Sequence, residues 1–169
     1  MITIKNTQRS FDLDLEKVHA DAQKILDELG YSEFDLGIWF TTNKTVREYN
    51  KSFRNKDKAT DILSFPYHPD LKAGQRIKVK DEEDKNVGDI LIAVEFVENL
   101  LPLYKTTLQK RISVLLIHGI CHLLGYSHYD DENDQKMKIK SVVQWSDSSS
   151  SVAHKIEIEQ ILSNWKSKK

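Results

Sequence analysis

Hydrophobic residues in the first half of the chain recur with two different spacings. From Leu15 to Leu29 they return every three or four positions, which is the period of an amphipathic helix, and Gly30 then provides a stop. Thr42 or Asn43 can cap a second, shorter helix that presents Val46, Tyr49 and Phe53 on one side. Short apolar runs predict four strands, at residues 2–4, 34–40, 62–65 and 88–93.

The second half of the chain has mainly helical spacing. Pro102 is predicted to separate a short helix at Val94–Leu101 from a long one at Thr106–Leu124. The long helix is apolar nearly all round after Ile112, which is typical of a helix through the middle of a core. Residues 66–87 have little apolar content and predict an exposed loop. Two further helices are predicted at Asp130–Val143 and Val152–Trp165.

These elements predict an α+β fold, in which helices cover a small mixed sheet of about four strands. A single domain is the default for 169 residues, because two independent cores would each be marginal. We expect this domain to span residues 1–147. Residues 148–169 then form a serine linker and an appended C-terminal helix.

Charge and cysteine content exclude several classes of protein. The 25 Lys and Arg residues nearly balance the 26 Asp and Glu residues, so a uniformly basic protein that coats nucleic acid is excluded. Cys121 is the single cysteine, which excludes a disulfide framework. Charged residues within the first 20 positions leave no room for a signal peptide. We therefore expect a soluble intracellular protein with no membrane partner.

Three histidines define the candidate chemistry. His118 and His122 lie at positions i and i+4 of the long helix, so they share one face, and Gly125 allows a turn that brings His128 back toward them. Each could be a core histidine with one hydrogen bond, but three imidazoles in an uncharged core helix are costly without a shared partner. Three imidazoles with an open fourth position are typical of a catalytic zinc site. We predict one zinc ion per chain, in a zincin-like site on a central buried helix.

The position after His118 bears on the reaction. The zinc-protease signature has a glutamate general base there, whereas this chain has Gly119, which argues against a zinc protease. A structural zinc would need a fourth protein ligand, and none is evident unless an aspartate or Cys121 supplies it. The downstream Asp130, Asp131 and Glu132 are either catalytic or simply the start of the next helix.

A basic segment spans residues 44–58. Six basic side chains stand there against the two acidic residues Glu48 and Asp57: Lys44, Arg47, Lys51, Arg54, Lys56 and Lys58. Arginine suits phosphate oxygens, so a polyanion could bind here. A solvated surface is the simpler alternative.

Three blocks of sequence together resemble the YbeY family. They are residues 53–66 (FRNKDKATDILSFP), residues 88–90 (GDI) and the histidine run 118–128 (HGICHLLGYSH). The likeness covers residues 1–143, whereas the serine linker and the last helix do not match. Residues 34–38 and 71–74 are more similar to the eukaryotic branch, which would imply a mitochondrial location instead of the cytoplasm of a bacterium.

The resemblance implies a zinc-dependent, single-strand-specific endoribonuclease that acts in ribosomal RNA processing and ribosome quality control. Its partners would be single-stranded or ribosomal RNA and the small ribosomal subunit or one of its proteins. A non-catalytic ribosome-assembly factor with a structural metal is the alternative. The implied metal ligands are His118, His122 and His128, and the resemblance implies that Arg54 lies beside the metal. Arg54 and His118 are the implied catalytic residues. The implied substrate-binding residues are Arg54, Lys56, Lys58, Thr60, Asp61 and Ser64.

Overall fold

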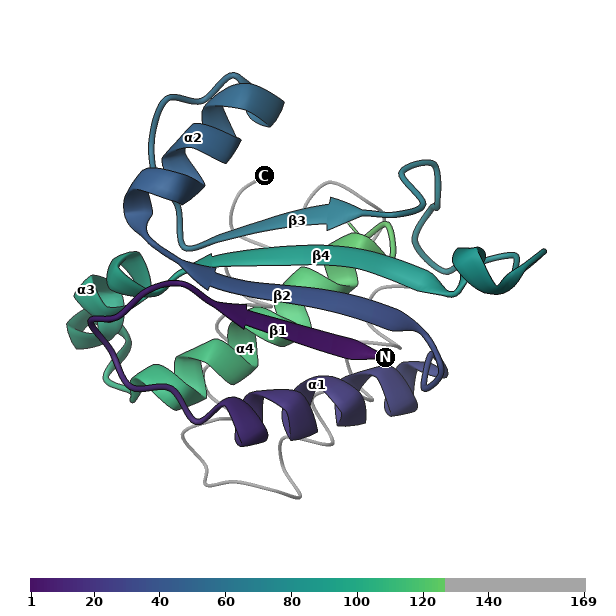
Figure 1. The fold of residues 1–169 in the computed structure, drawn as a ribbon, viewed down its shortest axis with the longest axis horizontal. Coiled ribbons are helices and arrows are strands. Elements are labelled where there is room, and N and C mark those ends of the chain that lie inside the picture. Colours follow the sequence, from purple (N-terminus) through teal and green to yellow (C-terminus); the bar gives the residue numbers. More distant parts are fainter. Residues whose placement is uncertain (127–169) are drawn as a thin grey trace.

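The computed structural model describes residues 1–126 and contains a single four-stranded sheet (Figure 1). The strands are β1 (Ile2–Asn6), β2 (Asp35–Thr41), β3 (Ile62–Pro66) and β4 (Asn86–Ala93). Their order across the sheet is β1-β2-β4-β3; β1–β2 and β2–β4 pair in parallel, whereas β3–β4 pair antiparallel. The helices are α1 (Leu15–Leu29), α2 (Asn43–Arg54), α3 (Val94–Tyr104) and α4 (Leu108–Leu123), with a 3-10 turn, η1, at Glu82–Asp84. The predicted α+β fold with a mixed sheet is confirmed.

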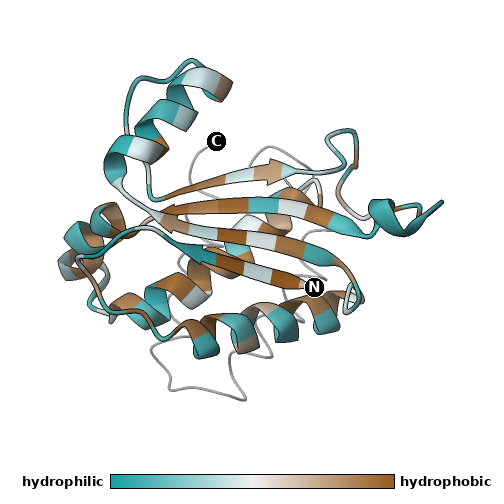
Figure 2. Cartoon of the chain, in the orientation of Figure 1, coloured by the Kyte–Doolittle hydropathy of each residue, from teal (hydrophilic) through white to brown (hydrophobic). Residues whose placement is uncertain are grey.

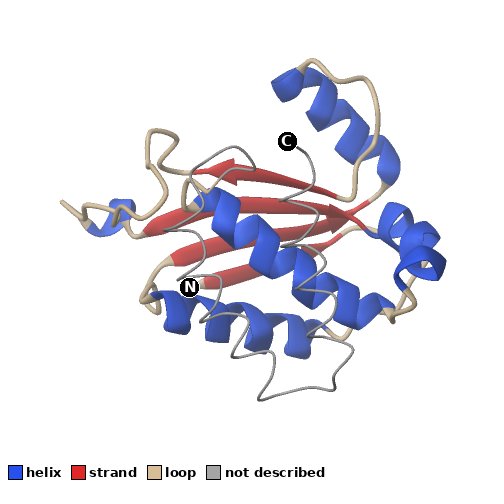
Figure 3. Cartoon of the chain, turned by 180° about the vertical axis from the view of Figure 1, so that it is seen from behind, coloured by secondary structure: helices blue, strands red, loops and turns tan. Residues whose placement is uncertain are grey.

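The two faces of the sheet are covered differently. In Figure 3, α1 and α4 lie across one face, which receives Ile90 and Ile92 of β4. The alternate residues Leu91 and Ala93 point to the opposite face, where they pack with Val46 of α2. Figure 2 shows the consequence in hydropathy: α4 is mostly hydrophobic, whereas α2 is mostly hydrophilic. The main core therefore lies between the sheet and the pair α1 and α4.

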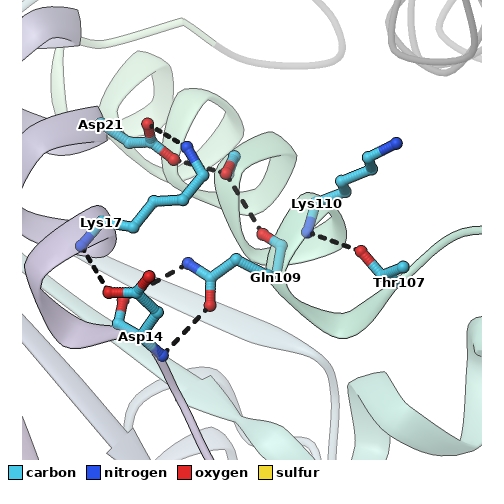
Figure 4. A network of polar contacts seen from close by, with 7 residues as sticks. Asp14, Lys17, Asp21, Thr107, Gln109 and Lys110 are labelled. Atoms are coloured by element: carbon cyan, nitrogen blue, oxygen red, sulfur yellow. Dashed lines mark hydrogen bonds and ion pairs between the residues drawn. The ribbon is translucent and has the colours of Figure 1, made fainter. Parts of the chain in front are cut away.

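Polar contacts fix α4 against α1 (Figure 4). The buried carboxylate of Asp21 accepts a hydrogen bond from Ser113 Oγ at 2.6 Å and pairs with Lys17 Nζ at 2.9 Å. At the start of both helices, the backbone N–H of Asp14 donates to the side chain of Gln109 at 3.3 Å. A buried carboxylate needs such partners, and here they hold the two helices in one register.

Three predictions about this part of the chain are corrected. Pro102 does not end α3, which continues to Tyr104 and stops at Lys105 in a left-handed conformation. A proline this near the helix end removes a single i→i−4 hydrogen bond, so the helix tolerates it. Strand β4 begins at Asn86, two residues before the predicted start. The predicted exposed loop at 66–87 is partly packed, because Ile77 is buried and Arg76 donates to the Leu29 carbonyl at the end of α1.

Several predictions fall outside the described residues. They concern His128, the helix at Asp130–Val143, the serine linker, the helix at Val152–Trp165 and the boundary of the domain at residue 147. Among residues 1–126, no helix is long and apolar enough to cross a membrane.

Candidate metal centre and basic segment

Helix α4 is buried along most of its length and opens to solvent at the two histidines. Between Arg111 and Leu124 every residue is buried except His118 and His122, which are half-buried. Their Nε2 atoms are 3.0 Å apart, and the ring planes meet at 81°. The i, i+4 spacing thus brings the two imidazoles together, as the sequence predicts.

A backbone contact orients the second histidine. His122 Nδ1 lies 2.7 Å from the Tyr126 carbonyl oxygen, so the ring N–H there donates and the lone pair is left on Nε2. Such hydrogen bonds to the distal nitrogen commonly fix the tautomer of a metal-binding histidine. Tyr126 is held in turn by its own N–H, which donates to the Cys121 carbonyl at 3.1 Å. The Nε2 atom of His122 is therefore directed toward His118.

Gly125 is required where α4 ends. Its φ of +81° lies in the left-handed region, and a Cβ there would sit 2.1 Å from the Leu71 carbonyl oxygen. The segment after β3 therefore passes directly against the turn that follows His122. A side chain at this position would displace that backbone and move Tyr126.

Gly119 allows α4 to pack closely against the sheet. A Cβ at this position would lie 2.7 Å from Ile90 Cδ1 and 3.0 Å from Ile62 Cδ1, so α4 rests directly on β3 and β4 here. The place where the zinc-protease signature has its glutamate therefore faces the apolar core. No carboxylate can act as general base from this position without being buried.

The two Nε2 atoms fit a shared metal ion. Two nitrogens that bind one tetrahedral zinc at about 2.0–2.1 Å lie roughly 3.3 Å apart, which is close to the spacing observed here. Within residues 1–126 no group of three His, Cys, Asp or Glu side chains could hold a metal ion. The third predicted ligand, His128, lies outside that range, so the three-histidine set stays a prediction.

Cys121 is part of the hydrophobic core around α4. Its side chain is buried, and burial raises the pKa of the thiol to about 12. We expect the native protein to resist alkylation of this thiol by iodoacetamide at pH 8, with full labelling after denaturation. Mass spectrometry of intact protein measures this, and rapid labelling without unfolding would contradict the burial.

The basic segment forms α2 and the loop that follows it. Thr42 caps the helix start by accepting from the Thr45 N–H, and Asn55 ends the helix in a left-handed conformation. The buried side chain of Asn50 then donates to the Lys58 carbonyl at 2.7 Å. This hydrogen bond holds the loop that carries Lys56 and Lys58 against α2.

One carboxylate neutralises part of the basic segment. Asp57 pairs with Arg47 at 2.7 Å and with Lys51 at 3.1 Å, and the hydrogen bond from Arg47 is the main reason that the pKa of Asp57 is lowered. Within the described residues, no ion pair engages Arg54, Lys56 or Lys58, which are all exposed. The charge available to a polyanion is therefore concentrated at the C-terminal end of α2.

The remaining predicted residues lie at and on β3. Asp61 Oδ1 accepts from Thr60 Oγ1 and from the Ile62 N–H, and Oδ2 faces the buried Arg111 of α4 at 3.8 Å. Arg111 also stacks on the ring of Tyr104. Asp61 thus links β3 to α4, two helical turns before His118. Sequence reasoning missed this contact, because nothing local marks Arg111 as its partner.

The structure brings these residues into two groups. His118 and His122 lie on α4, whereas Arg54, Lys56 and Lys58 belong to α2 and its following loop, and α2 packs on the opposite face of the sheet. The edge strand β3 contacts both helices. Ser64 alternates with Phe65 along β3 and shares the α4 face with Ile62. The edge strand β3 therefore lies between the two groups.

Comparison with known proteins identifies the family. The sequence model described as "YbeY: Endoribonuclease YbeY" matches residues 3–146. Proteins named Endoribonuclease YbeY are 32% identical to this chain in Homo sapiens, over 80% of this chain and 81% of the human protein, and 37% identical in Sulfurihydrogenibium, over 68% and 70%. The chain belongs to the YbeY endoribonuclease family.

A solved structure has a similar fold. The solution structure of TM1509 from Thermotoga maritima matches with a TM-score of 0.53, at 24% sequence identity. The match covers 88% of this chain and 94% of the other. This likeness supports the α+β architecture described above.

Proposed function

We propose that this protein is a zinc-dependent, single-strand-specific endoribonuclease that acts in ribosomal RNA processing and ribosome quality control. The proposal rests chiefly on the histidine pair, whose Nε2 atoms converge at 3.0 Å on the one half-buried part of α4. The names of the relatives support RNA as the substrate. The partners that we propose are single-stranded or ribosomal RNA and the small ribosomal subunit or one of its proteins.

One zinc ion would be held by His118, His122 and His128. Neutral imidazoles are preferred zinc ligands, and the Tyr126 carbonyl already holds His122 in the tautomer that ligation needs. When bound, such an ion polarises a phosphoryl oxygen or acidifies a water molecule. The packing of Gly119 argues against a zinc protease, because this residue faces Ile62 and Ile90 and leaves no place for the protease glutamate.

The chain's own charged residues would bind the RNA backbone. Arg54, Lys56 and Lys58 are exposed and outside the ion pairs of Asp57, so their charges can bind phosphates at the C-terminal end of α2. We propose that Arg54 places its planar guanidinium against the reacting phosphate and stabilises the charge that develops there. Thr60, Asp61 and Ser64 would border the path of the RNA along β3, with Asp61 keeping β3 against α4.

The function is tested by metal content and RNA cleavage in the same preparation. The substrate is a structured RNA with single-stranded tails, assayed before and after removal of metal by a chelator and again after zinc is restored. We expect about one zinc per chain and cuts in the tails that stop on chelation and return with zinc. Intact tails in the presence of stoichiometric zinc would instead indicate a non-catalytic assembly factor.

Arg54 provides a test of phosphate binding at the reacting centre. We expect Arg54→Ala to lower cleavage by about a hundredfold, because a cation directed at developing charge contributes strongly to the transition state. Arg54→Lys should recover little, since lysine lacks the planar fork. Single-turnover rates measure both effects. Lys44→Ala, at the other end of the same helix, is the control and should cleave normally.

The melting temperature separates catalysis from stability. Arg54 is exposed and takes part in no ion pair within the described residues, so zinc content and melting temperature should hardly change. A fall in melting temperature large enough to explain the lost cleavage would show that Arg54 is structural.

A further inference from the structure

The sheet face opposite α4 is largely open in the part of the chain that the structure describes. In Figure 1 this face is toward the viewer, and α2 lies at the edge of the sheet that β3 forms. A hollow of about 380 Å³ lies on this face. Its floor and wall include Lys5, Trp39, Tyr49, Phe53, Phe65 and Asp89. None of these residues belongs to the histidine pair.

Four aromatic rings form a continuous cluster along this hollow. Tyr49 and Phe53 stack one turn apart on α2, with centroids 5.8 Å apart and planes at 22°. Two T-shaped pairs extend the stack: Phe65 of β3 with Phe53, at 5.2 Å between ring centroids, and Trp39 of β2 with Tyr49, at 5.7 Å. Phe53 is 67% exposed although its neighbours in the cluster are half-buried. A contiguous exposed apolar patch with a polar border is typical of a binding site.

Positive charge surrounds these rings. Lys5 Nζ lies 4.3 Å from the centre of the Trp39 ring, and Arg54 directly follows Phe53 at the end of α2. Lys56 and Lys58 continue the basic segment from that point, outside the ion pairs of Asp57. Asp89 is the acidic residue of the hollow. Its carboxylate lies over Gly37, and a Cβ at position 37 would collide with it. Aromatic surface with a cationic border complements bases that are joined by phosphates.

We propose that this face is a stacking platform for unpaired bases of a single-stranded nucleic acid. One base would lie on the exposed Phe53 ring, and the flanking phosphates would contact Lys5 and the two lysines that follow α2, Lys56 and Lys58, while Arg54 is left for the reacting phosphate. The carboxylate of Asp89 can accept a hydrogen bond from the exocyclic amino group of a base. RNA as the strand rests on the proposed function. The platform itself extends that function, because it lies across the sheet from the histidines and would hold the strand beyond the site of cleavage.

The experiment measures binding without cleavage. The probe is a fluorescein-labelled RNA of about twelve nucleotides with alternating cytidine and adenosine, a length within the range that single-strand-binding folds cover. Fluorescence anisotropy in the presence of chelator gives the Kd. We expect Phe53→Ala to weaken binding about tenfold, since one base stack contributes on the order of 1–3 kcal/mol. Phe53→Tyr should bind like the original protein, and a duplex of the same length should compete poorly.

The control variant is Leu103→Ala. Leu103 lies on α3 and is 77% exposed, so this substitution removes a comparable exposed apolar side chain away from the platform. Because Phe53 and Leu103 are both exposed, neither change should unfold the protein, and matching circular dichroism spectra verify this. Unchanged Kd for Phe53→Ala, or an equal loss for Leu103→Ala, would overturn the proposal.

The outcomes separate the platform from the catalytic function. If zinc-dependent cleavage occurs but binding of the probe is independent of Phe53, the platform is wrong and the proposed function stands. In that case the aromatic cluster would be a contact surface for a protein partner instead of a nucleic acid. If the probe binds through Phe53 and no RNA is cleaved with zinc present, the platform stands and the endoribonuclease function fails. Failure of the chelated protein to bind the probe at all would also overturn the platform.

Discussion

The variant His122→Ala is expected to retain no zinc and to lose RNA cleavage. The substitution removes one of two imidazoles that already converge at 3.0 Å, and it also removes the N–H donated to the Tyr126 carbonyl. A site of three imidazoles reduced to two binds zinc far more weakly. Metal analysis after dialysis and a cleavage assay measure the two losses. The melting temperature of the zinc-loaded protein should fall as well, because metal affinity contributes to folding stability.

His19→Ala is the matched control for this experiment. His19 lies on the exposed side of α1, so its loss should leave zinc content, cleavage and melting temperature unchanged. Full cleavage by His122→Ala in a preparation shown to be free of metal would refute the proposed chemistry. Retention of stoichiometric zinc by that variant would show that His122 is not a ligand.

The variant Gly119→Glu is expected to unfold at much lower denaturant concentration and to gain no peptidase activity. The new side chain would start 2.7 Å from Ile90 Cδ1 and carry a carboxylate into the core between α4 and the sheet. Burying an unpaired charge places this change among the most destabilising single substitutions, at about 3–5 kcal/mol. Urea denaturation gives the free energy of unfolding, and a casein assay tests for proteolysis.

Gly119→Ala separates the effect of charge from that of volume. A methyl group needs only small shifts of two isoleucine side-chain ends, and alanine favours the helix over glycine by about 1 kcal/mol. We therefore expect this variant to stay within about 1 kcal/mol of the original stability. A glutamate variant as stable as the alanine variant would mean that α4 does not rest on the sheet at this position.

The secondary structure was largely predictable from sequence because local patterns determine it. The helical spacing at 15–29 and the apolar runs of the strands match α1 and the four strands closely. The errors came from tertiary context. Whether Pro102 ends a helix depends on how close it lies to the end of that helix. The burial of Ile77 depends on the ends of α1 and α4, which pack against its loop.

The candidate site was predictable only where its geometry is local. The i, i+4 spacing of His118 and His122 fixes their contact within one helix turn. The link between Asp61 and Arg111 crosses fifty residues of sequence and has no local signal. The spacing of α2 correctly placed Val46, Tyr49 and Phe53 on one side, yet Val46 is buried and Phe53 is exposed. Periodicity defines a helix face but does not tell how far the sheet beneath it extends.

The sheet order has a consequence for synthesis of the chain. Strand β4 is the inner strand that joins β2 to β3, yet it is the last of the four in the sequence. Before residues 86–93 leave the ribosome, β3 has no partner and β2 has an unpaired inner edge. Unpaired strand edges expose nascent chains to aggregation, and long-range pairing of this kind forms slowly. Folding of this protein on the ribosome should therefore be delayed until more than half of the chain has emerged.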